Sequence, residues 1–131
     1  MGLELKRIQS WFCYWFKKLA EKGASDAQYN IAQCYQRGHG FDQDKELAFK
    51  WYRESAEQGN VKAQHALGSC YQYGVGTKEN FKSAFKWYKE AAERGFVESQ
   101  FRLSQCYREG IGVERDYELY MKWHNKSLEE N

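Results

Sequence analysis

The side chains with the most reactive chemistry in this sequence are four cysteines and three histidines. Cysteine and histidine hold zinc when they lie at close, regular spacing, but the sequence contains neither a C-x-x-C motif nor a Cys/His cluster. His39, His65 and His124 also lack a Ser or Cys partner in any recognisable catalytic motif. The sequence therefore predicts no metal site, no cofactor and no enzymatic activity.

A Gly-x-Gly motif, which in other settings cradles phosphates, begins at Gly38, Gly74 and Gly110. A dinucleotide site requires this motif directly after a strand and before a helix. Here each copy follows a segment with helical periodicity. We therefore interpret the glycines as turns, because glycine adopts positive φ at a helix end without steric cost.

The cysteines, glycines and tryptophans recur with a constant spacing of 36 residues. The cysteines in phase are Cys34, Cys70 and Cys106, and the tryptophans are Trp51, Trp87 and Trp123. Residues 27–62 and 63–98 are identical at 17 of 36 aligned positions without a gap. Such a period indicates a repeat protein, in which each unit is one small supersecondary structure.

One period predicts a helix, a glycine turn and a second helix. In the first helix of residues 61–95, which Asn60 caps, the predicted core face is Ala63, Leu67, Cys70 and Tyr71. In the second helix, which Asn80 caps, the predicted core face is Ala84, Trp87, Ala91 and Ala92. Gly95 is expected to end this helix.

The stretch before the first full repeat keeps the same phase, because Trp15, Ala20 and Gly23 lie 36 residues before Trp51, Ala56 and Gly59. Residues 4–23 are therefore predicted to be a leading helix, or half repeat. The sequence predicts one all-α domain over residues 1–131, a right-handed α/α superhelix of about seven helices. Its repeats span residues 25–60, 61–96 and 97–131.

The spacing of small, aromatic and glycine residues resembles the Sel-1-like repeat, a relative of the tetratricopeptide repeat. The residues that carry the resemblance are Gln64, Leu67, Gly68, Tyr71, Gly74 and Gly76, followed by Ala84, Trp87, Ala91, Ala92 and Gly95. The third repeat departs from the pattern, with Ser104 in place of glycine. The resemblance implies a non-catalytic scaffold or adaptor, because proteins of this family serve in signalling and protein quality control.

The three in-phase cysteines are predicted to be buried, reduced packing thiols. Equivalent points on neighbouring repeats lie roughly 10 Å apart, whereas a disulfide requires Cα atoms within about 7 Å. Some relatives pair two cysteines inside each repeat, but these repeats have one each. Cys13 lies outside the pattern and is a candidate for an exposed thiol. Reduced thiols indicate a reducing compartment such as the cytoplasm.

By analogy with tetratricopeptide geometry, a concave groove is expected along the first helices of the repeats. The residues predicted to face it are Asp26, Tyr29, Gln33 and Arg37 in the first repeat, Lys62, His65, Ser69 and Tyr73 in the second, and Glu98, Phe101, Gln105 and Glu109 in the third. The eight of these predicted to bind a partner are Tyr29, Gln33, Arg37, His65, Ser69, Tyr73, Phe101 and Gln105. Tyr29, His65 and Phe101 are in phase and could form an aromatic ladder that holds a peptide or a partner helix. The alternative is that these rings only fill contacts between helices or face solvent.

The segment of residues 11–16 contains six successive apolar or aromatic residues, which cannot all face one neighbour on a helix. Trp15 and Leu19 are expected to pack on the first full repeat, leaving Trp11, Phe12 and Phe16 as a surface for self-association, including a homo-oligomer, or for a partner. Two alternatives stay open. The early residues fold back over the end of the stack, or a preceding helix of a longer chain covers this face.

Composition excludes several other function classes. The net charge is only +2, which provides no strong field for nucleic acid or an anionic membrane. No run of apolar residues is long enough to insert into a membrane. The aromatic content of 18% is too high for a disordered chain.

Overall fold

The computed structural model describes residues 2–129, so positions 1 and 130–131, the two ends of the predicted domain, lie outside the described residues. Within this range the chain forms seven helices and no strand. They are α1 (Gly2–Glu21), α2 (Ser25–Arg37), α3 (Lys45–Glu57), α4 (Val61–Tyr73), α5 (Phe81–Glu93), α6 (Val97–Glu109) and α7 (Tyr117–Leu128). The all-α fold expected from the sequence is confirmed.

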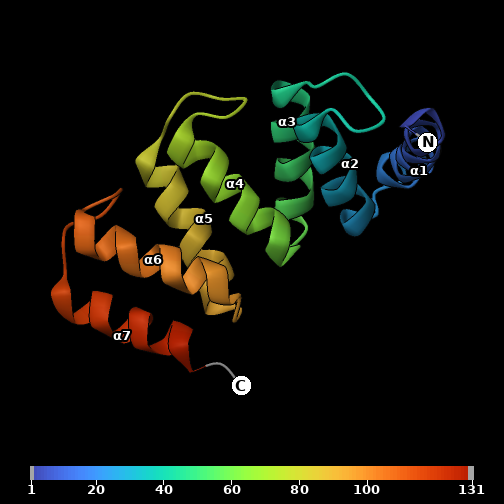
Figure 1. Cartoon of the computed structure of the whole chain (residues 1–131). Coiled ribbons are helices and arrows are strands. Elements are labelled where there is room, and N and C mark those ends of the chain that lie inside the picture. The colour runs from blue at the N-terminus through green and yellow to red at the C-terminus, as the bar shows by residue number, and fades with distance from the viewer. Residues whose placement is uncertain (1, 130–131) are drawn as a thin grey trace.

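The helices stack in the order of the chain, from α1 at one end to α7 at the other (Figure 1). Each helix packs mainly on the helix before it and the helix after it. This arrangement is a solenoid, in which every repeat is stabilised by its neighbours rather than by one central core.

Polar side chains cap the starts of four helices, α3, α4, α5 and α7, whereas α2 and α6 begin after Ala24 and Phe96 without a side-chain cap. Asn60 accepts a hydrogen bond from the backbone N–H of Ala63, and Asn80 accepts one from Ser83, as the sequence predicted. Asp44 and Asp116 do the same at the starts of α3 and α7. In α1 the position equivalent to these caps is Ile8, which lies 36 residues before Asp44 and 72 before Asn80. Ile8 lies inside the helix, so α1 does not begin where the other second helices begin.

The second glycine of each turn allows the loop to lie directly on the second helix of the previous repeat. A Cβ at Gly76, where φ is +73°, would collide with the carbonyl oxygen of Lys45, and Gly112 lies on Phe81 in the same way. Gly40 lies on α1, where a Cβ would be 2.6 Å from the Sγ of Cys13. The long helix α1 thus takes the place of a second helix.

In the first two repeats tyrosines, not tryptophans, fill the space between the helices, whereas in the third repeat Trp123 is buried and His124 stands at the tyrosine position. Tyr52 and Tyr88 are only 2% and 0% exposed, whereas Trp51 and Trp87 are half-buried. The expectation that Trp87 lies in the buried stripe is therefore wrong. Its neighbour Tyr88 takes that place because its ring lies against Gly68, where a Cβ would be 2.8 Å from the tyrosine ring.

Candidate functional site

The three rings of the predicted aromatic ladder are Tyr29, His65 and Phe101. Each contacts an aromatic ring 23 positions later, on the second helix of its own repeat. The ring centroids are 5.8 Å apart for Tyr29 and Tyr52, 5.4 Å for His65 and Tyr88, and 6.4 Å for Phe101 and His124. Within residues 2–129 the three predicted ladder rings make these contacts rather than stacking on one another. The repeated element is therefore a pair of rings inside each repeat.

An upstream hollow of about 270 Å³ lies between α2, α3 and α4. Its lining residues are Tyr29, Gln33, Gln36, Tyr52, Ala66, Ser69, Cys70, Tyr73 and Val75. The polar atoms already form a network: Gln33 donates to the hydroxyl of Tyr29 at 2.8 Å, and Tyr52 donates to Gln36 at 2.6 Å. The hollow thus presents neutral hydroxyls and amides above a buried aromatic floor.

A downstream hollow of about 370 Å³ lies between α4, α6 and the end of α7. Its lining residues are His65, Val97, Glu98, Phe101, Arg102, Ser127 and Leu128. Three of these are exposed apolar side chains, Val97, Phe101 and Leu128, beside one acidic and one basic group. The lining of this hollow is therefore more apolar than that of the upstream hollow, and its edge also has two charged groups.

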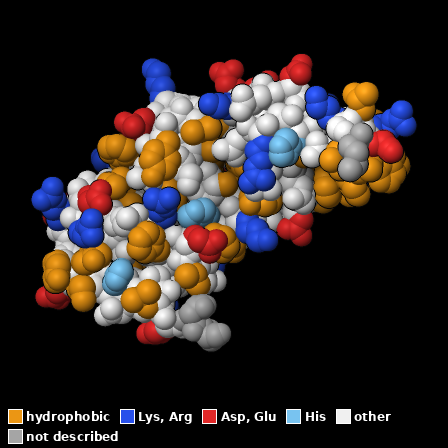
Figure 2. Space-filling model, viewed as in Figure 1, with side chains coloured by type: hydrophobic (Ala, Val, Ile, Leu, Met, Phe, Trp, Pro, Cys, Tyr) orange, Lys and Arg blue, Asp and Glu red, His pale blue; other side chains and the backbone are white. Residues whose placement is uncertain are grey.

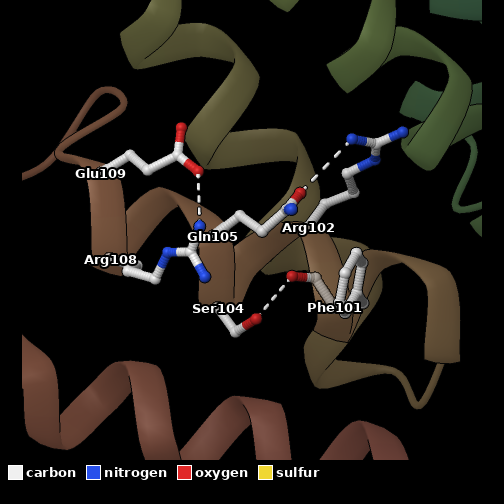
Figure 3. A network of polar contacts seen from close by, with 6 residues as sticks. All are labelled: Phe101, Arg102, Ser104, Gln105, Arg108 and Glu109. Atoms are coloured by element: carbon white, nitrogen blue, oxygen red, sulfur yellow. Dashed lines mark hydrogen bonds and ion pairs between the residues drawn. The ribbon is translucent and has the colours of Figure 1, made fainter.

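Polar contacts join neighbouring residues along α6, the helix that provides most of the lining of the downstream hollow (Figure 3). Ser104 donates to the carbonyl of Phe101 at 2.6 Å, and Arg102 donates to Gln105 at 3.3 Å. Arg102 also contacts the hydroxyl of Tyr73 at 3.4 Å, which joins the edges of the two hollows. The two hollows therefore share one boundary, formed by α4 and α6.

Of the eight groove residues predicted to bind a partner, six line one of these hollows. The upstream hollow contains Tyr29, Gln33, Ser69 and Tyr73, and the downstream hollow contains His65 and Phe101. Arg37 and Gln105 line neither. Sequence reasoning missed Tyr52 and Gln36, although the fixed 23-residue spacing to Tyr29 points to Tyr52.

Burial sets the protonation of the groups around the hollows. Burial raises the pKa of Tyr29 and Tyr52, so both hydroxyls stay protonated and able to donate. Burial also lowers the pKa of His65, against a smaller opposing effect of Glu98. The upstream hollow therefore interacts through neutral hydrogen-bonding groups at neutral pH, whereas the downstream hollow also has Glu98 and Arg102 at its edge.

The lowered pKa of His65 predicts a loss of stability in mild acid. The unfolded chain takes up a proton on the His65 ring more readily than the folded chain. The stabilising contribution of the neutral ring to the free energy of unfolding is therefore complete above about pH 6.5 and is lost as the pH falls through the folded pKa. We expect the drop in Tm between about pH 7 and about pH 5 to be smaller in His65→Asn than in the wild type. His39→Asn, a change at an exposed histidine in the loop after α2, is the matched control. The same drop in all three proteins would contradict this prediction.

The cysteines are free thiols, and Cys70 and Cys106 are buried while Cys34 is partly buried. The expectation that Cys13 is isolated and exposed is wrong, because this side chain is 3% exposed and donates to the carbonyl of His39 at 3.0 Å. Burial, together with a hydrogen bond that the Cys34 thiol donates to Cys13, raises the pKa of Cys34 to about 12. The thiols of Cys34, Cys70 and Cys106 are thus packing groups whose raised pKa keeps them protonated.

Helix α1 turns a different face inward from the one expected. Cys13 and Ala20 are buried and Phe16 is half-buried against the core, whereas Trp15 and Leu19 remain about half exposed. Trp11 and Phe12 are exposed as predicted, at 58% and 51%, but Phe16 is not part of that surface. The cause is the phase of the repeat, which places Phe16 36 residues before the core residue Tyr52.

The described part of the chain offers no sign of metal or membrane-spanning chemistry. No group of three or more potential metal ligands comes together within residues 2–129. No helix in that range combines the length and hydrophobicity that crossing a bilayer requires.

The Sel1 repeat family model matches residues 13–23, 25–60, 61–96 and 97–131. No curated protein sequence matches the chain. Among solved structures, the chain resembles c5321, described as a protective antigen of uropathogenic Escherichia coli strains with an SLR fold, at 39% identity and a TM-score of 0.87. That match covers 88% of this chain and 25% of the other.

A Sel1 repeat protein from Oxalobacter formigenes is 34% identical, with a TM-score of 0.85, covering 89% of this chain and 48% of that one. Helicobacter pylori cysteine rich protein B shares the fold at 18% identity and a TM-score of 0.68, covering 86% of each chain. This chain thus spans a quarter to a half of the length of the two more similar proteins. Sel1 repeats generally form protein-interaction modules on a non-catalytic fold. On the match to its repeats and to these structures, the chain belongs to the Sel1 repeat family.

Proposed function

We propose that this chain is a non-catalytic scaffold or adaptor that binds a segment of a partner protein across the upstream and downstream hollows. The observation that carries the proposal is that both hollows lie along the first helices, on α2 and α4 upstream and on α4 and α6 downstream, and meet where Arg102 contacts Tyr73. Two lining positions are equivalent in the repeat, because Tyr29 and Ala66 lie 36 residues before His65 and Arg102. Repeat proteins use such rows of equivalent positions as extended binding surfaces.

The chemistry of the two hollows favours an extended peptide. The hydroxyls and amides of the upstream hollow can exchange hydrogen bonds with peptide N–H and C=O groups. In the downstream hollow, Phe101, Val97 and Leu128 offer an apolar seat for one anchoring side chain. A peptide with an apolar anchor and several polar backbone contacts therefore fits both.

The test is selection of peptides from a random display library on the wild-type chain, followed by calorimetry on purified variants. We expect Tyr73→Ala combined with Phe101→Ala to weaken the selected peptides by roughly 10- to 100-fold, as for aromatic residues at the centre of an interface. Both side chains are exposed, at 57% and 43%, so the fold should tolerate their loss. Tyr117→Ala on α7, where the side chain is 71% exposed, is the matched control. Equal binding to the double variant and the control would reject the groove.

A second candidate function is self-association through α1. The observation in its favour is the row of large apolar side chains that α1 leaves exposed at the end of the solenoid. In this case the chain is a structural unit, and the hollows are incidental.

The compartment stays a prediction. One unpaired thiol per repeat suits a reducing environment such as the cytoplasm, which we propose as the place where the chain works.

A further inference from the structure

The exposed face of α1 corresponds to a face that is covered in the other second helices. Phe12 is 51% exposed, whereas the residues 36 and 72 positions later, Ala48 and Ala84, are 1% and 0% exposed. Leu19 is 48% exposed, and its counterpart Ser55 is 0% exposed. In α3 this face lies against α2 of the same repeat, where the hydroxyl of Ser55 donates to the carbonyl of Ser25 at 2.7 Å.

Helix α1 cannot be covered in the same way, because it is helical where the other repeats have their loop. Glu4 stands in place of the second loop glycine, Gly40 or Gly76, and Ile8 stands in place of the capping Asp44. The backbone runs as one helix through both positions. Within residues 2–129 no helix fills the place beside α1 that a first helix fills in the other repeats, and Figure 2 shows hydrophobic side chains gathered over this end of the molecule.

The side chains on this face indicate what kind of helix would fill the place. Large residues, Phe12 and Leu19, replace the small Ala48 and Ser55, so the covering helix must lie farther away than α2 lies from α3. Five of the eight exposed large apolar side chains on α1 follow alternating spacings of three and four, the pattern of a helix that pairs with another in a coiled coil. They are Leu5, Ile8, Phe12, Trp15 and Leu19.

We propose that α1 pairs with α1 of a second copy of this chain in an antiparallel, two-fold symmetric interface, which rests on the second candidate function given above. The apolar stripe of Leu5, Ile8, Phe12, Trp15 and Leu19 is self-complementary when two copies of α1 run antiparallel. When Leu5 of one copy lies against Trp15 of the other, Ile8 of the first copy lies against Phe12 of the second. The two-fold axis repeats both contacts with the two copies exchanged. Arg7, Ile8, Trp11 and Phe12 already line a hollow of about 350 Å³ on α1, which can receive an apolar side chain of the second copy.

The charges beside the stripe favour the same direction. Glu4 and Lys18 lie on one flank of the stripe, two heptads apart, near opposite ends of α1. In the antiparallel pair, Glu4 of each copy lies opposite Lys18 of the other, with Trp11 of both copies near the axis. A parallel pair would bring like charges to the same level.

The experiment is sedimentation of the full chain at several concentrations and at low salt, with charge-swap variants. We expect the wild-type chain to form a dimer with a micromolar Kd. Glu4→Lys alone or Lys18→Glu alone should raise this Kd roughly 5- to 10-fold, and the two changes combined should restore the wild-type Kd. Phe12→Glu should raise the Kd by roughly 100-fold or more. The matched control is Tyr117→Glu, at a 71% exposed tyrosine on α7, which should leave the Kd unchanged.

A wild-type chain that stays monomeric up to about 100 µM would overturn the proposal. So would a monomer whose α1 binds vesicles of anionic phospholipid, since the face would then be a membrane contact. Failure of the double charge swap to restore the dimer would reject the antiparallel pairing. Far-UV circular dichroism verifies that each variant is folded, and peptides selected on the hollows should still bind Phe12→Glu, which separates this proposal from the groove.

Discussion

Gly76→Ala is expected to lower the free energy of unfolding by about 3 kcal/mol or more, although it adds a single methyl group. Two costs combine at this position. The backbone has a φ of +73°, which strains any L side chain, and the added Cβ would meet the backbone carbonyl of Lys45 and approach the Cβ of Phe49 to 2.9 Å. A carbonyl inside a helix cannot move aside, so the loop must leave the surface of α3.

Gly95→Ala separates these two costs, because Gly95 also has a positive φ, +94°, but has nothing within 4 Å of the added Cβ. We expect this control to lose only about 1 kcal/mol. Urea unfolding followed by circular dichroism measures both. Equal losses at Gly76 and Gly95 would mean that the contact between the loop and α3 does not stabilise the stack.

Tyr88→Ala is the second change with a large expected effect, a loss of about 3–5 kcal/mol. Tyr88 is 0% exposed, it packs against the backbone at Gly68, and its hydroxyl donates to Gln72 at 2.7 Å. Its removal leaves a cavity between α4 and α5 and takes the ring away from His65. Tyr88→Phe keeps the ring and should lose only about 1 kcal/mol, the value of the hydrogen bond.

Tyr117→Ala is the matched control for Tyr88→Ala, since Tyr117 is 71% exposed on α7, and its loss should stay within about 0.5 kcal/mol. Thermal unfolding of the three variants and the wild type provides the comparison. A loss at Tyr88 no larger than that at Tyr117 would show that the tyrosine does not hold the two helices of the repeat together.

The helices and their order could be predicted from the sequence, because the small, aromatic and glycine positions recur every 36 residues. The caps could be predicted from residue type rather than from the period, since Ala24 and Phe96, 36 residues on either side of Asn60, make no side-chain cap. Asn60 and Asn80 begin helices as expected, and Gly74 ends α4 with a left-handed conformation. Six of the eight expected groove residues line a hollow, because the first-helix positions follow directly from the helical phase. Whether those hollows bind a partner stays a prediction.

The orientation of adjacent aromatic residues could not be predicted in the same way. Trp51 and Tyr52 are about 100° apart on one helix, and the crossing geometry of α2 and α3 decides which ring enters the core. The same geometry turns Phe16 inward and Trp15 outward on α1. The burial of Cys13 depends on the loop at Gly40, 27 residues away in the sequence, so no local pattern indicates it.

Because each helix packs mainly on its two neighbours, the contact between one repeat and the next is nearly the same wherever it occurs. A tandem duplication of any whole 36-residue unit would therefore join the existing stack at surfaces that already match, without a new type of contact. Homologous chains of this architecture can differ in repeat number while they keep the same local structure, and lengthening or shortening the array is an accessible route to a longer or shorter binding surface.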